Sequence, residues 1–199
     1  MASTLHRIVQ RRGGPSSRRI GGQIVSSDFF SVEVWTKRGL RTHYVLFFLD
    51  LETRRVHFGG LTWHPNDTFM AQAARGLPRF LMGKRFLICD RDTKYSKKFC
   101  AMLPERMKVH RTPFQAPNAN AHAERFVRSI KSECLSRMIW FGEEPLRKAI
   151  FEFLEHYPQE RNHQGLANEL IETRPKATMG EVVSRERLGG LLKHYGRAA

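Results

Sequence analysis

Apolar and polar residues alternate or cluster along the first third of the chain in the way that β-strands require. Residues 23–35 are strand-like, with a single acid, Asp28, set among phenylalanines and valines. Residues 42–50 form a strongly apolar run that suits a central strand, and residues 54–62 alternate apolar with polar positions. Because only short turns separate these runs, the pattern predicts a three-stranded meander.

After the predicted meander, apolar residues recur at the spacing of a helix. Asn66 can cap a helix whose apolar residues recur every three or four positions. The elements expected from there are a helix ending at Pro78 or the following glycine, a buried strand at 85–90, a small helix at 96–102, a strand at 108–111 and a loop at 112–120. This order mixes strands and helices without the regular alternation of a doubly wound fold, so the fold class predicted is α/β with a mixed sheet.

Long helices are predicted in the last third of the chain. The strongest pattern covers 119–138, where apolar residues form one stripe along a helix. A second helix is expected at 145–157, because Pro145 suits a first helical turn. Residues 161–166 read as a loop. The last forty residues mix charges of both signs with a few apolar positions, and we expect one or two short helices there.

The charge of the chain narrows the class of partner. It has 199 residues, a formal net charge of +15 and a sequence pI of about 10.5. Such an excess favours a polyanion, through phosphate contacts and counterion release, without indicating sequence specificity. No apolar stretch approaches the length of a membrane span, so no membrane partner is expected.

The ends of the chain and its cysteines suggest an organisation. Residues 1–22 are predicted to be a basic flexible arm, with a mitochondrial transit peptide as the less favoured alternative. Residues 23–175 would form the core and residues 176–199 a C-terminal tail. Three cysteines without a paired spacing indicate reduced thiols, and hence a cytoplasmic protein.

Three carboxylates stand out by their settings. Asp28 interrupts a strand, Asp90 ends a buried apolar run, and Glu124 opens a helical pattern. An acid inside an apolar strand is costly unless it is compensated. Hard oxygen ligands from separate elements suit Mg²⁺, and two such ions can activate the attacking oxygen and stabilise the leaving oxygen of a phosphodiester. We therefore expect these three residues to be both catalytic and metal-binding.

Other acids compete for the same role. Asp92 lies two positions after Asp90 and could be the ligand in its place; Asp90 is preferred because it is closer to the buried strand, which leaves Asp92 as a supporting residue. Asp50 precedes a tight turn and is interpreted as a turn residue. Glu133 lies well along the helix from Glu124 and is expected to be solvated.

Basic residues accompany Glu124 on its helix. Glu124, Arg128 and Lys131 fall at positions i, i+4 and i+7 and therefore share one face. This arrangement could hold a metal and a DNA backbone together. The simpler interpretation is an ordinary Glu–Arg helix pair, worth a few tenths of a kcal/mol.

Four segments together resemble a known family. They are 27–35, 89–94, 117–126 and the stretch from Tyr157 through 161–166. In this order they resemble the integrase catalytic core of DDE transposases from bacterial insertion sequences and their retroviral-integrase-like relatives. Asp28, Asp90 and Glu124 fall on that family's D, D and E.

The resemblance implies a fold, a cofactor and a substrate. The fold would be RNase H-like, with a mixed five-stranded sheet flanked by helices. The cofactor would be two Mg²⁺ or Mn²⁺ ions, and the reaction metal-dependent DNA strand cleavage and transfer at element ends and target DNA, by a homo-oligomer in the bacterial nucleoid. Candidate DNA contacts are Arg125, Arg128, Lys131, Asn118 and Asn120, and His163 would support the site or touch DNA.

Alternatives to an active transferase remain at this point. About twenty residues precede the expected core, without the helix-turn-helix module that full-length relatives carry there. A truncated, non-catalytic DNA-binding remnant is therefore one alternative. An RNase H-type nuclease acting on RNA–DNA hybrids would share the fold and the metals, and it is the other.

Overall fold

The computed structural model describes residues 22–112, 121–161, 171 and 181–197, which form two compact units. The first unit holds the described residues up to Glu33 and from Arg41 to Val127. The second holds Val34–Leu40 and the described residues from Arg128 onward. The domain boundaries expected from the sequence, at residues 22 and 175, remain predictions. No helix among the described residues is long and apolar enough to cross a membrane.

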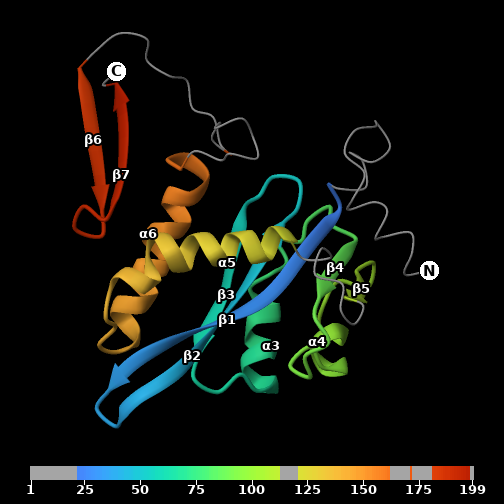
Figure 1. Ribbon diagram of the computed structural model, residues 1–199. Helices are drawn as coiled ribbons and strands as arrows, with labels where there is room; N and C mark the ends of the chain where they lie inside the picture. The colour runs from blue at the N-terminus through green and yellow to red at the C-terminus, as the bar shows by residue number, and fades with distance from the viewer. Residues whose placement is uncertain (1–21, 113–120, 162–170, 172–180, 198–199) are drawn as a thin grey trace. The chain divides into compact units, whose positions relative to one another are not determined.

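A five-stranded mixed sheet is built from the first half of the chain, as the sequence predicts (Figure 1). Its order is β3-β2-β1-β4-β5. β2 pairs antiparallel with β3, whereas β4 pairs parallel with both β1 and β5. The strands are β1 (Ile24–Thr36), β2 (Gly39–Asp50), β3 (Val56–Thr62), β4 (Phe86–Cys89) and β5 (Lys108–Arg111).

Helices α3 (Asp67–Arg75) and α4 (Lys97–Ala101) pack with one face of this sheet in the first unit. The shared core includes Val25 of β1, Met70 of α3 and Phe99 of α4, each at most 1% exposed. Asn66 caps α3, because its side chain accepts a hydrogen bond from the Phe69 amide at 2.9 Å, as expected. α3 ends at Arg75, before Pro78, because the Gly76 amide already turns back onto the last carbonyls.

The opposite face of the sheet is covered by helix α5 (Ala121–Glu133), whose first half belongs to the first unit. Phe126 of α5 lies 4.9 Å from the ring of Phe47 on β2, which lies 5.9 Å from Phe30 on β1. Alternation along β1 therefore sends even-numbered residues towards α5 and odd-numbered residues towards α3 and α4.

Helix α5 is shorter than the sequence predicts. The expected helix continues to Met138, but α5 ends at Glu133 and is followed by the 3₁₀ turn η2 (Leu135–Arg137). At the end of α5, Arg137 Nε donates a hydrogen bond to the Ser132 carbonyl at 3.0 Å. This side chain replaces the backbone amide that a further helical turn would have supplied. A carbonyl at the end of a helix that already accepts a hydrogen bond from a side chain does not need the amide of a further helical residue as its donor.

The second unit is built around helix α6 (Glu143–Gln159), with Pro145 in its first turn as predicted. Its buried face, which includes Leu146, Ile150 and Phe153, forms the apolar centre of this unit. Trp140, just before α6, is 5% exposed, and its indole N–H donates to the Leu135 carbonyl at 3.1 Å.

The expectation of short helices in the last forty residues is wrong for residues 181–197, where the structure has a β-hairpin. Strands β6 (Val182–Arg187) and β7 (Leu192–Arg197) pair antiparallel over six residue pairs. Gly189 and Gly190 form the turn with φ of +64° and +88°, a conformation that glycine adopts readily. The charged residues that suggested helices, such as Arg185, Glu186 and Arg187, instead lie along a strand.

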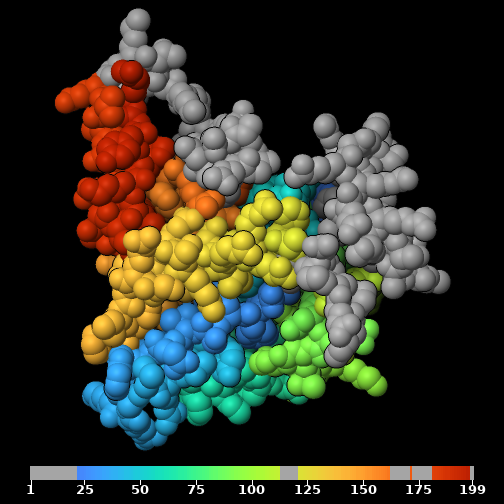
Figure 2. Space-filling view, viewed as in Figure 1, coloured from blue at the N-terminus to red at the C-terminus, as the bar shows by residue number. Residues whose placement is uncertain are grey.

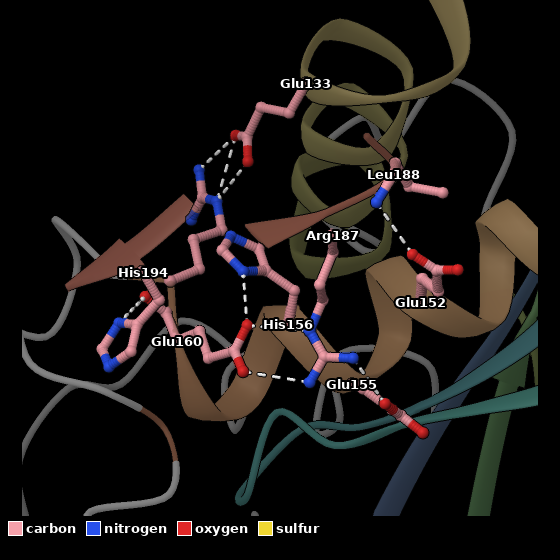
Figure 3. A network of polar contacts seen from close by, with 9 residues as sticks. Glu133, Glu152, Glu155, His156, Glu160, Arg187, Leu188 and His194 are labelled. Atoms are coloured by element: carbon pink, nitrogen blue, oxygen red, sulfur yellow. Dashed lines mark hydrogen bonds and ion pairs between the residues drawn. The ribbon is translucent and has the colours of Figure 1, made fainter. Parts of the chain in front are cut away.

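A network of ion pairs joins this hairpin to α6 within the second unit (Figure 3). The Arg187 guanidinium donates to both carboxylate oxygens of Glu160, at 2.9 and 3.0 Å, and to Glu155 at 2.7 Å. The Leu188 amide donates to Glu152 at 2.9 Å. These contacts fix the hairpin to one face of the helix.

Candidate functional site

Asp28 lies in the middle of β1, on the face that α5 covers. Its neighbours on this face, Ser26 and Phe30, are buried, whereas Asp28 is partly exposed. The Phe29 amide donates to its Oδ1 at 2.8 Å. The strand thus carries a carboxylate at the point where its alternating burial would otherwise place an apolar side chain.

Asp90 directly follows β4 and lies level with Asp28. In the parallel β1–β4 pair, Ile24 is opposite Phe86 and Ser26 is opposite Ile88, a constant offset of 62 residues. Continued two residues beyond Ser26 and Ile88, the same offset aligns Asp28 with Asp90. Residues paired in parallel strands point to the same face, so the topology brings these two acids side by side at the end of β4.

The loop after β4 separates the roles of Asp90 and Asp92. Asp90 Oδ1 accepts the Asp92 amide at 3.0 Å. The Asp92 carboxylate forms an ion pair with Lys94 and also accepts the Lys94 amide at 2.9 Å. Burial alone would raise the pKa of Asp92, but these Lys94 contacts lower it. Asp92 therefore has a cation within the protein, and the preference for Asp90 as a ligand stays a prediction.

Lys94 is a residue that the sequence analysis missed. Its ammonium lies over the rings of Phe29 and Tyr44, at 5.2 and 5.7 Å from their centroids, besides pairing with Asp92. The aromatic faces and the carboxylate together hold this cation near the loop. Its position two residues after Asp92 was the only available signal.

Glu124 lies in the first turn of α5 and is exposed. Its neighbours Ala123 and Phe126 are at most 1% exposed, and they pack α5 against the sheet. Packing of these two residues orients the first turn, so Glu124 lies beside the buried stripe, as the helical pattern predicts. A helix N-terminus also favours nearby anions.

The electrostatics of Asp28 show that these acids interact. Burial, together with the nearby carboxylates of Asp90, Glu124 and Asp92, raises its pKa from 3.8 to about 6, while the Phe29 hydrogen bond opposes them. Like charges raise a carboxyl pKa when they lie close enough to repel. The fold therefore concentrates negative charge around Asp28 from two strand regions and one helix.

The carboxylates of Asp28, Asp90 and Glu124 are chemically suited to bind a hard divalent cation. Carboxylates are the oxygen ligands that Mg²⁺ prefers, and a cation would reverse the repulsion that raises the pKa of Asp28. Within the described ranges, however, no three His, Cys, Asp or Glu side chains are close enough together to form a ligand group. Mutual repulsion favours such a spread, so ion binding would require the carboxylates to draw together.

The tyrosine beneath the site was also missed from the sequence. Tyr95 is fully buried, and its hydroxyl lies 2.8 Å from Ser27 Oγ, which in turn donates to the Phe47 carbonyl at 3.2 Å. Arg111 donates to the Tyr95 carbonyl at 2.7 Å. These bonds tie β1 to the loop after β4, and they fix the backbone that carries Asp28.

The predicted basic residues of α5 are available to a partner. Arg125 and Arg128 are exposed and Lys131 is partly buried. The remaining predicted contacts, Asn118, Asn120 and His163, lie outside the described residues.

Two competing acids have structural roles. Asp50 is 5% exposed and accepts hydrogen bonds from Lys84 Nζ at 2.7 Å and from Thr53 Oγ1 at 2.7 Å, which confirms it as a turn residue. The expectation for Glu133 is wrong. It is partly buried and paired with the Arg161 guanidinium through hydrogen bonds of 2.7 to 3.0 Å, because the end of α6 brings a cation against it.

Comparison with known proteins supports the resemblance. A family model described as an integrase core domain matches residues 105–169, about a third of the chain. No significant match is found among curated proteins. The matched segment includes α5 and therefore Glu124.

Solved structures show the same fold at low sequence identity. The HTLV-2 integrase catalytic core domain, solved in complex with magnesium in a trimeric form, is 15% identical with a TM-score of 0.54, covering 75% of this chain and 93% of its own. A chain of the simian T-cell lymphotropic virus intasome is 13% identical with a TM-score of 0.56, covering 94% of this chain and 69% of its own. The BIV integrase catalytic core domain is 12% identical with a TM-score of 0.52, covering 72% and 88%. The predicted RNase H-like fold is thereby confirmed.

Proposed function

We propose that the chain is a metal-dependent DNA strand-transferase of the integrase type, acting in DNA transposition or integration. The observation that carries this proposal is the electrostatic coupling of Asp28 to Asp90 and Glu124, on an RNase H-like fold. Burial and three neighbouring acids raise the pKa of Asp28, in a chain with a net charge of +15. Such a combination suits a site that neutralises its own acids with cations and binds a polyanion.

Asp28, Asp90 and Glu124 are the residues proposed to hold divalent cations, two Mg²⁺ or Mn²⁺ ions. When bound, such ions activate the attacking oxygen and stabilise the leaving oxygen of a phosphodiester. The HTLV-2 integrase core, which has the same fold, was solved with magnesium. The chain's own part is to position the acids: β1 and β4 supply two from the sheet, and α5 supplies the third.

Basic groups along α5 are proposed to bind the DNA backbone. Arg125 and Arg128 are exposed on the helix that carries Glu124, and Lys131 follows on the same side as Arg128. Backbone contacts orient the duplex without reading its sequence. Asn118 and Asn120 are proposed as further contacts, and His163 as a supporting residue. The DNA would comprise element ends and a target, bound by a homo-oligomer at the bacterial nucleoid.

Asp92 is proposed to support the site from outside through Lys94. Its carboxylate is held by that lysine, and its amide donates to Asp90 Oδ1 at 3.0 Å. This hydrogen bond is made to Oδ1 of Asp90, so the other carboxylate oxygen, Oδ2, is the one proposed to bind a cation. Asp92 would thus orient the ligand without being one.

A cleavage and strand-transfer assay tests the proposal. The purified chain is incubated with duplex oligonucleotides carrying element ends, with a plasmid target, and with Mg²⁺ or Mn²⁺. Asp28→Asn, Asp90→Asn and Glu124→Gln should each reduce product by at least about 100-fold, since a site that acts through bound ions fails without a ligand. DNA binding, measured in EDTA, should persist in all three.

A matched control and the contrary outcomes make the assay decisive. Glu105→Gln changes an exposed acid remote in sequence from the cluster and should leave activity unchanged. Full activity in any one ligand variant would remove that residue from the site. Absence of metal-dependent activity in the wild-type chain, with intact DNA binding, would favour a non-catalytic remnant. Preferential cleavage of RNA–DNA hybrids over duplex DNA would favour an RNase H-type nuclease.

A further inference from the structure

The turn between β1 and β2 carries an exposed apolar patch within the second unit. Four side chains form it: Trp35, Leu40, Ile139 and Phe141, which are 49%, 52%, 70% and 70% exposed. We refer to these four residues as the tip patch. Figure 2 shows the β1–β2 turn, in blue, at the molecular surface.

Hydrogen bonds place the members of the tip patch next to one another. The Trp35 amide donates to the Trp140 carbonyl at 2.8 Å, and the Gly142 amide donates to the Trp35 carbonyl at 2.8 Å. These two bonds make a parallel bridge in which Trp35 is paired with Phe141. Paired residues lie on one face, so the two rings are neighbours.

The tight turn adds Leu40 to the same row. β1 ends at Thr36 and β2 begins at Gly39, so only two residues form the turn, and Trp35 lies opposite Leu40. Thr36 Oγ1 donates to the Gly39 carbonyl at 2.8 Å, which closes the turn. The apolar row therefore crosses three adjacent backbone segments and is held by backbone geometry.

Exposed and buried side chains alternate along residues 139–141, so only one side of this segment contributes to the tip patch. Trp140 is 5% exposed, and it lies between Ile139 and Phe141, which are both 70% exposed. An extended segment that buries its middle residue turns its two neighbours outward. Contiguous exposed apolar side chains of this kind mark a binding surface more often than a solvated one.

The charge beside the tip patch points to an anionic partner. The turn itself is Lys37 and Arg38, both exposed, and residues 34–41 contain no acid. The next acids after Phe141 are Glu143, which is ion-paired with Arg147, and the exposed Glu144. A second copy docked symmetrically through this turn would bring two pairs of cations together, which like-charge repulsion disfavours.

We propose that the tip patch binds unpaired bases of nucleic acid, with Lys37 and Arg38 on the adjoining phosphates. Aromatic rings offer stacking surfaces to bases, and leucine, isoleucine and phenylalanine act as wedges between base steps in proteins that unstack DNA. The choice of nucleic acid as the anion rests on the proposed function. The binding itself requires neither the carboxylates nor a metal.

Equilibrium binding in EDTA tests this proposal apart from any chemistry. Fluorescence anisotropy compares a fully paired duplex with a duplex of equal length that carries a short unpaired segment. The wild-type chain should prefer the second probe. Trp35→Ala and Phe141→Ala should each weaken binding to the unpaired probe by about 5-fold or more, the effect of losing one stacked base, and should barely change duplex binding.

Matched variants separate stacking from charge and from misfolding. Trp35→Phe retains a ring and should restore most of the preference. Lys37→Ala combined with Arg38→Ala should weaken binding to both probes and reduce the salt dependence. Tyr195→Ala removes an equally exposed ring, 65% exposed, outside the tip patch and should change neither affinity. Thermal melting of each variant identifies any that fail to fold.

Three outcomes would overturn the proposal. The first is equal affinity of the wild-type chain for the two probes. The second is a loss of preference in Tyr195→Ala as large as in Trp35→Ala. The third is a change in sedimentation coefficient in Trp35→Ala without a change in DNA affinity, which would assign the tip patch to contact between copies of the chain. A retained base preference in a chain without cleavage activity would overturn only the proposed function.

Discussion

The pKa values of two carboxylates in this protein, one in each unit, are shifted in opposite directions. In the first unit, burial and three neighbouring acids raise the pKa of Asp28 to about 6. In the second unit, burial would raise the pKa of Glu160 too, but hydrogen bonds from Arg187 and His156 lower it to about 2. Both groups are carboxylates of partly or fully buried side chains, so the environment alone sets the difference.

The comparison separates structural from functional acids on physical grounds. Glu160 is stabilised as an anion by cations that the chain supplies (Figure 3), so its charge serves to hold the β6–β7 hairpin on α6. Asp28 is destabilised as an anion by burial and by the acids that the fold places around it. Groups held in an unfavourable ionisation state are candidates for function because stability alone does not select for them.

The largest effect is expected from removing the cation of the structural group. Arg187→Ala leaves Glu160, whose side chain is 5% exposed, without its bidentate partner. Breaking a buried pair from one side costs about 3 kcal/mol or more. Urea unfolding should show this loss, and amide hydrogen exchange should quicken in β6 and β7.

Arg185→Ala is the matched control for that change. Arg185 is exposed on the same strand, two residues before Arg187. Its removal should alter the free energy of unfolding by no more than about 0.5 kcal/mol. Equal losses in the two variants would mean that Arg187 stabilises the hairpin in a general way, and the contrast between Glu160 and Asp28 would lose its basis.

The sequence predicts the first unit better than the second, for a physical reason. Strand alternation and the Asn66 cap are local signals, and they locate β1 to β5 and α3 within a few residues. Asp28, Asp90 and Glu124 could be singled out because an acid in or beside an apolar run is locally anomalous. The proximity of Asp28 to Asp90 follows from the pairing of β1 with β4, which local patterns alone do not specify.

The residues that sequence reasoning missed depend on distant partners. Glu133 looks solvated on its own helix, but Arg161 lies 28 residues away and pairs with it. Lys94 gains its role from the rings of Phe29 and Tyr44 as well as from Asp92. The mixed charges of the β6–β7 hairpin fit helical pairs equally well, so the local pattern predicts helices, and the Gly189–Gly190 turn is the signal that favours a hairpin.

Neutralising Asp28 should have the opposite effect on stability from Arg187→Ala. Because its folded pKa exceeds its ordinary value of 3.8, the native state binds its proton more tightly, and ionisation destabilises the fold as pH rises from about 4 through about 6. Asp28→Asn removes that cost. It should stabilise the protein by up to about 3 kcal/mol at pH 7.5 and by little at pH 4.

Denaturation at both pH values, with Glu105→Gln as the control, checks this prediction. The control acid is exposed, and its substitution should not change the pH dependence of stability. The same Asp28→Asn variant should have lost strand transfer. A variant that is destabilised at pH 7.5 would show that Asp28 is held favourably as an anion, which would remove the contrast with Glu160.

The smallest effect should come from adding a divalent cation to the wild-type chain. An ion that binds the native carboxylates stabilises the fold by about 1.4 kcal/mol at ten times its dissociation constant. MgCl₂ should therefore raise the melting temperature at pH 7.5, beyond what NaCl of equal ionic strength achieves. Below pH 6 the rise should shrink, because protons then compete for Asp28, whose pKa is about 6. Asp28→Asn and Asp90→Asn should abolish the ion-specific part, whereas Arg187→Ala should retain it, because the ion-pair partners of Arg187 are Glu155 and Glu160 and not the proposed ligands. An equal Mg²⁺ response in Asp28→Asn would locate the ion elsewhere.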